Sequence, residues 1–352
     1  MLAKPTPELP VGDGWRYEPK WDGFRALVFR DGPEVYLQSR DLKPLDRYFP
    51  ELIEPLRGVG GPKARFVLDG EIVIARDGGL EFESLLLRIH PAASRVAMLA
   101  AETPSSFVAF DCLADGSKDL RDAPLDDRRA RLEALMRDAP DSVLLTPATS
   151  DPKVARHWFD VFEGAGLDGV IAKRHDLRYL PGKREMAKIK HLRTADCVVA
   201  GFRWHKNGPG TLVGSLLLGL WNDAGDLQHV GVTSSFTVAK RAELVPFLEP
   251  YRKDALKDHP WKQWREWEES AAASGRRLPG ATSRWNRGKD LSWEPLRPEL
   301  VCEVAFDHLQ GDRFRHGTTF KRWRPDKSPA DCRYDQLEET PAALLTDLFG
   351  AR

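Results

Sequence analysis

The chain has 352 residues, a formal net charge of zero and 30% charged side chains. This is an ordinary soluble composition for two or three domains, without the overall basic charge that indicates nucleic acid. The four cysteines are scattered, which argues against a disulfide framework or a cysteine-rich zinc site. The longest apolar run, VGSLLLGLW, is too short to span a bilayer, so we expect a cytoplasmic protein with no membrane partner.

The first half of the chain has the pattern of a mixed α/β domain. Two strand-like stretches contain an Asp-Gly turn signal and are predicted as β-hairpins. Two helical patterns are bounded by a proline near the start or by glycines at the end. The predicted elements are hairpins over residues 24–40 and 65–78, a strand over 105–114, helices over 123–138 and 151–166, and short strands over 168–174 and 185–193.

The second half is mostly β, and a domain boundary is predicted at residues 191–196. Its order of elements is strand, strand, strand, helix, strand, strand, which is expected of an OB-type barrel. We therefore predict one domain over residues 1–193 and an OB-fold domain over 194–352. The predicted strands cover 197–204, 211–221, 227–235, 300–309 and 319–325, and the helix covers 237–252.

A charged, tryptophan-rich insertion, residues 254–296, separates the predicted helix from the fourth strand. One interpretation is a surface helix and loop whose tryptophans pack locally. The other is a segment that docks on another domain or contacts DNA. Its five tryptophans are Trp261, Trp264, Trp267, Trp285 and Trp293.

The stretch YEPKWDGFRALVF, residues 17–29, brings Lys20, Asp22 and Arg25 together at the start of an apolar run. Asp-Gly is a turn signal, so the simplest interpretation is a hairpin that carries a surface lysine. The alternative is a nucleophilic lysine with its electrostatic surroundings. A Lys-x-Asp-Gly match alone does not decide, because so short a string occurs often by chance.

Short strings further along the chain bear on that choice. LDGEIV places Asp69 and Glu71 on a predicted hairpin, and VAFDCL places Phe110 in a strand. Lys188 and Lys190 share one face of a strand because side chains alternate along it. Two lysines on one face repel each other unless that face meets solvent or an anion, and a solvated edge is the simpler case. The basic C-terminal string RFRHGTTFKRWRPDK by itself indicates a solvated surface.

In their order and spacing these strings resemble the motifs of the covalent nucleotidyltransferases. Within that superfamily they are similar to the ATP-dependent DNA ligases of the short bacterial type, whose module also occurs in end-joining ligases. The resemblance covers nearly the whole chain, from EPKWDGFR to RWRPDK. It implies an α+β fold, in which an adenylation (nucleotidyltransferase, ATP-grasp-like) domain of antiparallel sheets and helices precedes a C-terminal OB-fold β-barrel.

The resemblance also implies a reaction and the residues that carry it. Lys20 takes AMP from ATP, the AMP passes to the 5′-phosphate at a DNA nick, and the 3′-hydroxyl displaces it. The implied set is Lys20 and Asp22 as catalytic residues; Arg25, Arg40, Glu71, Phe110, Ile171, Arg184, Lys188 and Lys190 for ATP or AMP; Arg324, Asp326 and Lys327 for pyrophosphate; and Asp22 and Asp168 for Mg²⁺ or Mn²⁺.

Each implied role has a physical reason and a plain alternative. Cations beside Lys20 favour its neutral, nucleophilic amine. Glu71 would accept the ribose hydroxyl, while Phe110 and Ile171 would cover the two faces of adenine. For the two apolar residues the alternative is core packing. For Asp22 and Asp168 it is turn formation.

Two positions depart from the family pattern. Asp168 stands where glutamate is usual, and Met186 stands where an aromatic residue often precedes the paired lysines. Other activities on the same motifs are an RNA ligase, a GTP-dependent capping guanylyltransferase, or a non-catalytic DNA-binding module. We expect a monomer in the cytoplasm at the nucleoid, acting on nicked duplex DNA in repair, recombination or replication, with end-joining or excision-repair proteins as candidate partners.

Overall fold

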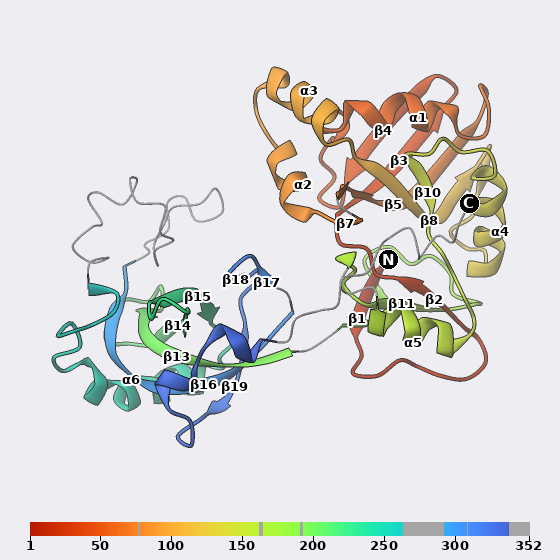
Figure 1. The fold of residues 1–352 in the computed structure, drawn as a ribbon. Coiled ribbons are helices and arrows are strands. Elements are labelled where there is room, and N and C mark those ends of the chain that lie inside the picture. The colour runs from red at the N-terminus through yellow and green to blue at the C-terminus, as the bar shows by residue number, and fades with distance from the viewer. Residues whose placement is uncertain (77, 162–164, 191–192, 263–291, 308, 338–352) are drawn as a thin grey trace. The chain divides into compact units, whose positions relative to one another are not determined.

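The computed structural model describes residues 1–337, apart from 77, 162–164, 191–192, 263–291 and 308 (Figure 1). Residue contacts divide the chain into two compact units, one within Met1–His191 and one within Leu192–Glu339. Both units combine helices with sheets, so the α+β class is confirmed. None of the described helices has the length and apolar character that a membrane crossing requires.

The larger sheet of the first unit has the strand order β10-β8-β5-β3-β4. All its neighbouring strands are antiparallel except β10 and β8. The predicted hairpin over 24–40 is confirmed, because β3 and β4 pair around the Asp31-Gly32 turn. The strands are β3 (Phe24–Asp31), β4 (Glu34–Ser39), β5 (Arg65–Val73), β8 (Ser106–Asp115) with its short partner β9 (Lys118–Asp119), and β10 (Val143–Leu145).

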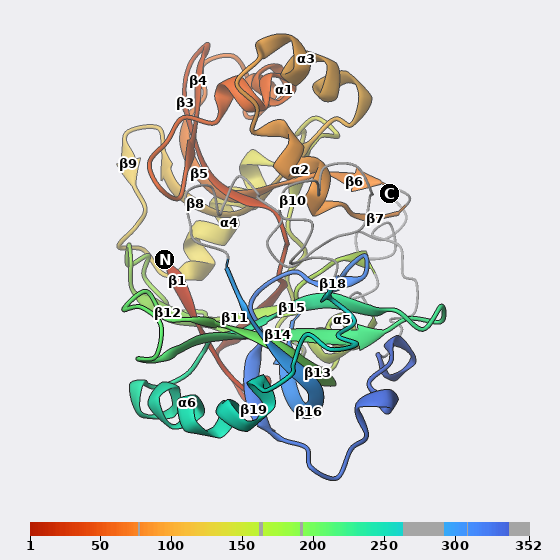
Figure 2. The ribbon, with the colours of Figure 1, turned by 90° about the vertical axis from the view of Figure 1, so that its left-hand side faces the viewer.

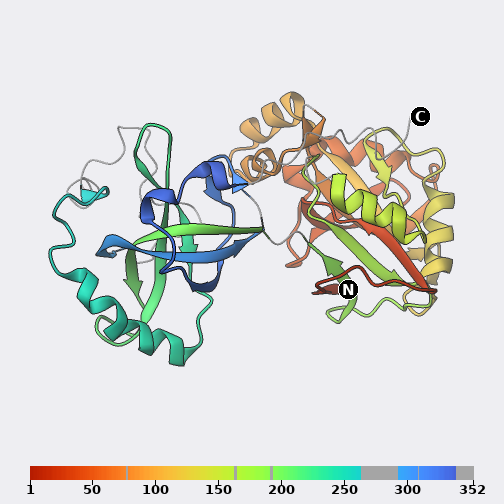
Figure 3. The ribbon, with the colours of Figure 1, turned by 60° about the horizontal axis from the view of Figure 1, so that its bottom comes forward.

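The smaller sheet has the order β1-β12-β11-β2, and only its β1–β12 pair is parallel. Helix α5 (Pro152–Val161) packs against β2 and β11 of this sheet (Figure 3). The strands are β1 (Leu2–Pro5), β2 (Trp15–Pro19), β11 (Val170–Arg174) and β12 (Arg184–Ile189).

The remaining helices of the first unit surround the larger sheet. Helix α4 packs against β8 and α1 against β4, over a core in which Val28, Leu68 and Phe107 are fully buried. Both predicted helices exist, although shorter than expected over the described residues. The bounds are α1 (Ile53–Gly58), α2 (Phe82–Arg88), α3 (Ala93–Glu102) and α4 (Leu125–Leu135), with a small ribbon of β6 (Ala75–Arg76) and β7 (Gly79–Leu80) before α2.

Two turn predictions were wrong. Asp69 and Gly70 lie inside β5, paired on both sides, rather than at a hairpin turn. A Cβ at Gly70 would lie 2.3 Å from the Phe107 ring, so this glycine permits close packing instead of a turn. Asp22 and Gly23 do not form a hairpin either, because β2 and β3 belong to different sheets. Lys20 therefore lies in the connection between the two sheets.

The second unit is a five-stranded antiparallel sheet of order β15-β14-β13-β16-β19, and it confirms the predicted OB-type order of elements. Helix α6 follows the third strand and packs along β14 and β16 (Figure 2). The bounds are β13 (Arg193–Trp204), β14 (Val213–Trp221), β15 (Leu227–Thr233), α6 (Val238–Arg252), β16 (Glu294–Phe306), β17 (Leu309–Gln310), β18 (Arg313–Phe314) and β19 (Thr319–Trp323).

The described ends of the tryptophan-rich insertion belong to the core of the second unit. Trp261 is fully buried, and its indole N–H donates to the Leu227 carbonyl at 2.8 Å. Trp293 is also buried, and the two rings meet edge to face at 5.9 Å. Local packing is thus confirmed for these two residues. The positions of Trp264, Trp267 and Trp285 lie outside the described residues.

Candidate active site

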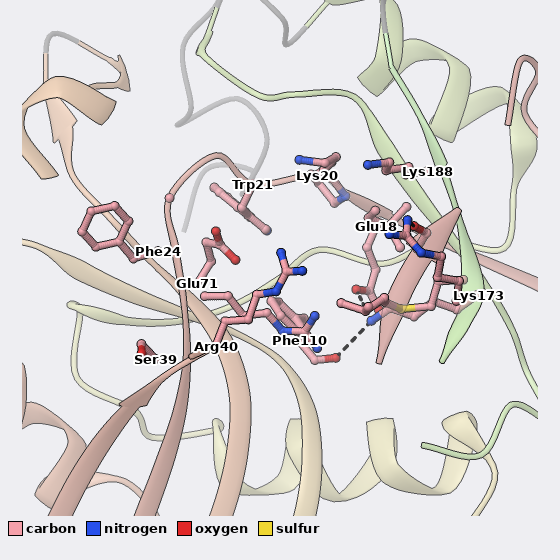
Figure 4. A pocket seen from close by; sticks show the side chains of 18 of the residues that line it. Glu18, Lys20, Trp21, Phe24, Ser39, Arg40, Glu71, Phe110, Lys173 and Lys188 are labelled. Atoms are coloured by element: carbon pink, nitrogen blue, oxygen red, sulfur yellow. Dashed lines mark hydrogen bonds and ion pairs between the residues drawn. The ribbon is translucent and has the colours of Figure 1, made fainter. Parts of the chain in front are cut away.

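A pocket of about 600 Å³ opens in the first unit, a size typical of small-molecule sites (Figure 4). Strands of both sheets and the connection that carries Lys20 contribute its walls. The structure therefore brings together side chains that lie far apart in the sequence. Eight of the expected site residues line it: Lys20, Arg25, Arg40, Glu71, Phe110, Ile171, Arg184 and Lys188.

Lys20 is held beside the start of β11 by two backbone hydrogen bonds. Its N–H donates to the Gly169 carbonyl and its carbonyl accepts from the Asp168 N–H, both at 2.8 Å. Gly169 has a φ of +118°, and a Cβ there would lie 2.0 Å from the Ile189 carbonyl oxygen. Only glycine suits so close a passage, which brings Asp168 next to Lys20.

Asp168 is shared by two ammonium groups. Its carboxylate contacts the Lys20 Nζ, and the Lys190 Nζ lies 2.7 Å from its Oδ2. The aspartate is only 6% exposed. Aspartate is shorter than the glutamate usual at this position, yet it reaches both lysines. Lys190 itself does not line the pocket, but its contact with Asp168 holds it close to Lys20.

Lys188 adds a further cation to this wall of the pocket. Burial lowers its pKa, and the nearby charges of Lys190 and Lys20 lower it further. Within this group three lysines face one aspartate. The excess positive charge suits a bound phosphate. Of the two interpretations of the lysine pair, a solvated strand edge or a face that meets an anion, this arrangement favours the second.

Glu71 lies on β5 directly opposite Arg25 of β3 and is partly buried in the pocket wall. Burial raises its pKa from 4.5 to about 8, although the charges of Lys20 and Arg25 act in the opposite direction. Near neutral pH the carboxyl group therefore holds a proton for much of the time. A donor or cation bound in the pocket would favour its ionised form.

We expect a Glu71→Gln substitution to change the pH dependence of stability. Because the folded pKa is raised, the folded state binds the extra proton, and this contribution to stability is lost as pH rises from about 4.5 to about 8. Glutamine cannot lose that proton. Urea unfolding at several pH values should show the wild type losing stability relative to the variant across this window. Parallel curves for the two proteins would contradict the expectation.

Arg25 is held by a buried partner that its sequence motif did not reveal. Its Nε and Nη2 donate to the two oxygens of Asp69 at 2.9 and 2.6 Å, and the Met1 carbonyl accepts from Nη1. Asp69 is fully buried and also accepts from the Tyr179 hydroxyl at 2.8 Å. Each nitrogen of the Arg25 guanidinium has a partner here, so the side chain is held in place where it lines the pocket.

Two cationic side chains lie near the Phe110 ring. The Arg25 guanidinium is 5.6 Å and the Lys173 ammonium 5.1 Å from the ring centroid, within the range of cation–π attraction. Lys173 also forms a buried ion pair with Glu18 at 2.6 Å. Phe110 and Ile171 are partly exposed toward the pocket, so core packing alone does not describe them.

The second unit holds the three residues expected to act on pyrophosphate. Arg324 pairs with Asp196 at 2.8 and 2.9 Å and with Asp326 at 2.8 Å, and Lys327 lies 3.8 Å from Asp196. Glu303 is a further neighbour of Arg324 at 3.8 Å. These cations are thus paired with carboxylates of their own unit.

Two sequence models of protein families match this chain, one in each half. The model for the "ATP dependent DNA ligase domain" matches residues 1–190, and that for the "ATP dependent DNA ligase C terminal region" matches residues 209–327. The two matches together cover most of the chain. The chain belongs to the ATP-dependent DNA ligases.

Curated relatives align with almost the full length of the ligase. It is 52% identical to DNA ligase C2 of Mycolicibacterium smegmatis, with 97% of this chain and 94% of that one covered. It is 51% identical to DNA ligase C of Mycobacterium tuberculosis, with 99% and 96% covered. A solved structure from a study of Lig E DNA ligases has a TM-score of 0.51 at 18% identity, covering 88% of this chain and 93% of that one. It supports the shared fold.

Four residues of the ligase site have roles that the sequence motifs did not indicate: Glu18, Asp69, Lys173 and Tyr179. Glu18 could have been suspected, because it precedes Lys20 by only two positions. Met186, a departure from the family pattern, is buried and lines the pocket. Asp22 does not line it, although its neighbours Trp21 and Gly23 do.

Proposed function

We propose that this ligase seals nicks between a 5′-phosphate and a 3′-hydroxyl in duplex DNA through an AMP adduct on Lys20. The observation that carries the proposal is the placement of the Lys20 ammonium in a nucleotide-sized pocket among Lys188, Lys190 and Asp168. Residues 1–193 would form the adenylation domain and residues 194–352 the OB-fold domain.

In the first step the neutral Lys20 Nζ attacks the α-phosphorus of ATP. A nitrogen–phosphorus bond forms, the bond to the bridging oxygen breaks, and pyrophosphate leaves with the electron pair. Asp168 accepts a hydrogen bond from the Lys20 Nζ and would orient it for the attack. Lys188 and Lys190 would attract the α-phosphate oxygens, on which negative charge increases in the transition state.

The rest of the pocket would hold the nucleoside. Phe110 and Ile171 would cover the two faces of adenine, and Glu71 would accept the ribose hydroxyl. Arg40 and Arg184 are exposed at the pocket, where they could reach phosphate or ribose oxygens. Arg25 lines the same pocket beside the Phe110 ring and would contribute to binding ATP or AMP there.

Asp22 and Asp168 are proposed to hold a divalent cation, Mg²⁺ or Mn²⁺. Carboxylate oxygens suit these hard ions, which commonly take one or two protein carboxylates together with phosphate oxygens and water. The described residues contain no group of three or more metal-binding side chains, so the substrate would have to supply ligands. The bound ion would offset negative charge on the phosphates.

The residues of the second unit would act on the leaving group. We propose that Arg324, Asp326 and Lys327 orient pyrophosphate. Arg324 and Lys327 would exchange their carboxylate partners for phosphate oxygens in order to do so. DNA contacts in later steps are expected to be mostly electrostatic, hence sensitive to salt and independent of sequence.

We propose a cytoplasmic, nucleoid-associated role in DNA repair, with end-joining or excision-repair proteins as candidate partners and the ligase itself a monomer. A 30% identical relative that supports this context is the multifunctional non-homologous end joining DNA repair protein LigD of Mycobacterium tuberculosis, with 90% of this chain and 37% of that longer one covered.

Sealing assays with purified protein test the proposed function. With ATP and Mg²⁺ the enzyme should join a singly nicked DNA duplex, and label from α-labelled ATP should appear on the protein. Matched substrates with an RNA strand, and GTP in place of ATP, separate the ligase from an RNA ligase or a capping enzyme. Labelling by GTP alone, or no sealing of nicked DNA, would overturn the proposal.

A further inference from the structure

The carboxylate of Asp196 holds two cationic side chains of the second unit. Asp196 lies on β13, and its two oxygens accept hydrogen bonds from the Arg324 Nη1 at 2.8 and 2.9 Å. The side chains of Asp196 and Arg324 are only 14% and 15% exposed. The Lys327 Nζ lies 3.8 Å from the same carboxylate. Two of the three residues proposed to orient pyrophosphate therefore share one carboxylate.

The other two nitrogens of the Arg324 guanidinium bind a second carboxylate. Nε donates to the Asp326 Oδ1 at 3.0 Å, and Nη2 donates to its Oδ2 at 2.8 Å. Asp326 lies in the turn that the Lys327 N–H closes on the Arg324 carbonyl, so it can move together with Arg324. Asp196 instead belongs to the sheet, and the Gln336 side chain fixes its backbone through hydrogen bonds at 2.7 and 3.1 Å. Of the two carboxylates, Asp196 is thus the one that anchors the guanidinium to the sheet.

The charges around Asp196 balance, unlike those around Lys20. At Lys20 three lysines face one aspartate, and the surplus of positive charge suits a phosphate. Around Asp196 three cations face three carboxylates: Arg322, Arg324 and Lys327 against Asp196, Glu303 and Asp326. A phosphate that approaches Arg324 therefore meets Asp196 both as a competitor for the same N–H groups and as a like charge.

We propose that Asp196 is a positioning residue that restrains Arg324 and Lys327 until pyrophosphate replaces it as their anionic partner. Because the phosphate must first displace this carboxylate, the cost of breaking the pair offsets part of its binding free energy. Asp196 thereby lowers the affinity of these cations for pyrophosphate and favours its release once the AMP adduct has formed. The inference rests on the proposed function, namely that Arg324 and Lys327 bind the pyrophosphate produced at Lys20.

The test follows the reverse of the first step, in which added pyrophosphate converts the isolated enzyme–AMP adduct to ATP and free enzyme. The measured quantities are kcat and KM for pyrophosphate. In Asp196→Asn the KM should fall by at least about threefold with little change in kcat, because the competing charge is gone. Glu299→Gln is the matched control: it removes an exposed carboxylate of β16 that pairs with Arg297, changes the net charge equally, and should keep the wild-type KM.

Further variants separate positioning from a structural role. Asp196→Ala repeats the test with a side chain that forms no hydrogen bond, and thermal unfolding checks that each variant folds. Arg324→Gln should raise the KM for pyrophosphate, and adding Asp196→Asn to it should lower the KM much less than in the wild-type background. A folded Asp196 variant with an unchanged or higher KM, or an equal decrease in both backgrounds, overturns the inference alone. A wild type that forms no adduct with ATP overturns the proposed function and the inference with it.

Discussion

Replacing Lys20 by alanine should abolish the enzyme–AMP adduct while the protein stays folded. The lysine lies in a connection between two sheets and its side chain is 20% exposed. Its loss leaves Asp168 paired with Lys190, so no buried charge loses its only partner. Without the attacking amine we expect adduct formation to fall by at least about 10⁴-fold.

Two measurements separate loss of the nucleophile from general damage. The variant should still join a nick whose 5′-phosphate already carries AMP, because that step needs no lysine adduct. Lys153→Ala, at an exposed position of α5, should retain both activities. An acid-stable AMP adduct on the Lys20→Ala protein would show that the nucleophile lies elsewhere.

Local sequence signals predicted much of the fold. The hairpin of β3 and β4 and the order of elements in the OB-fold unit follow from strand alternation, turn residues and one helical pattern. The same signals failed at Asp69-Gly70, because a glycine that admits the Phe107 ring looks identical to one that turns the chain. Close packing is decided by a residue distant in sequence, which no local pattern contains.

In the candidate site, too, local sequence patterns did not reveal contacts between residues that are distant in the sequence. Short motifs indicated Lys20, Lys188 and Lys190 only because their order resembles a family; the shared carboxylate of Asp168 lies 148 positions from Lys20. The partners Glu18 and Lys173 are 155 positions apart, and no local pattern indicates that these two side chains meet. Such partners become visible only when β2 and β11 are paired in a sheet.

The Asp69→Asn substitution should have the largest effect on stability among the expected results. Asp69 is fully buried, and its carboxylate binds Arg25 through two hydrogen bonds and the Tyr179 hydroxyl through a third. Asparagine keeps the shape but leaves the Arg25 charge without its counter-ion. Breaking one side of such a pair costs about 3–5 kcal/mol. Since Arg25 also adjoins the Phe110 ring, adduct formation should decline in parallel.

Tyr179→Phe provides the matched control for this network. It removes one hydrogen bond to Asp69 and no charge, so the free energy of unfolding should fall by only about 1 kcal/mol. Urea unfolding of both variants and of the wild type measures the difference. If Asp69→Asn were no less stable than Tyr179→Phe, the carboxylate would not be the counter-ion that holds Arg25. Equal rates of adduct formation in Asp69→Asn and in the wild type would show that the Asp69–Arg25 pair does not affect the reaction at Lys20.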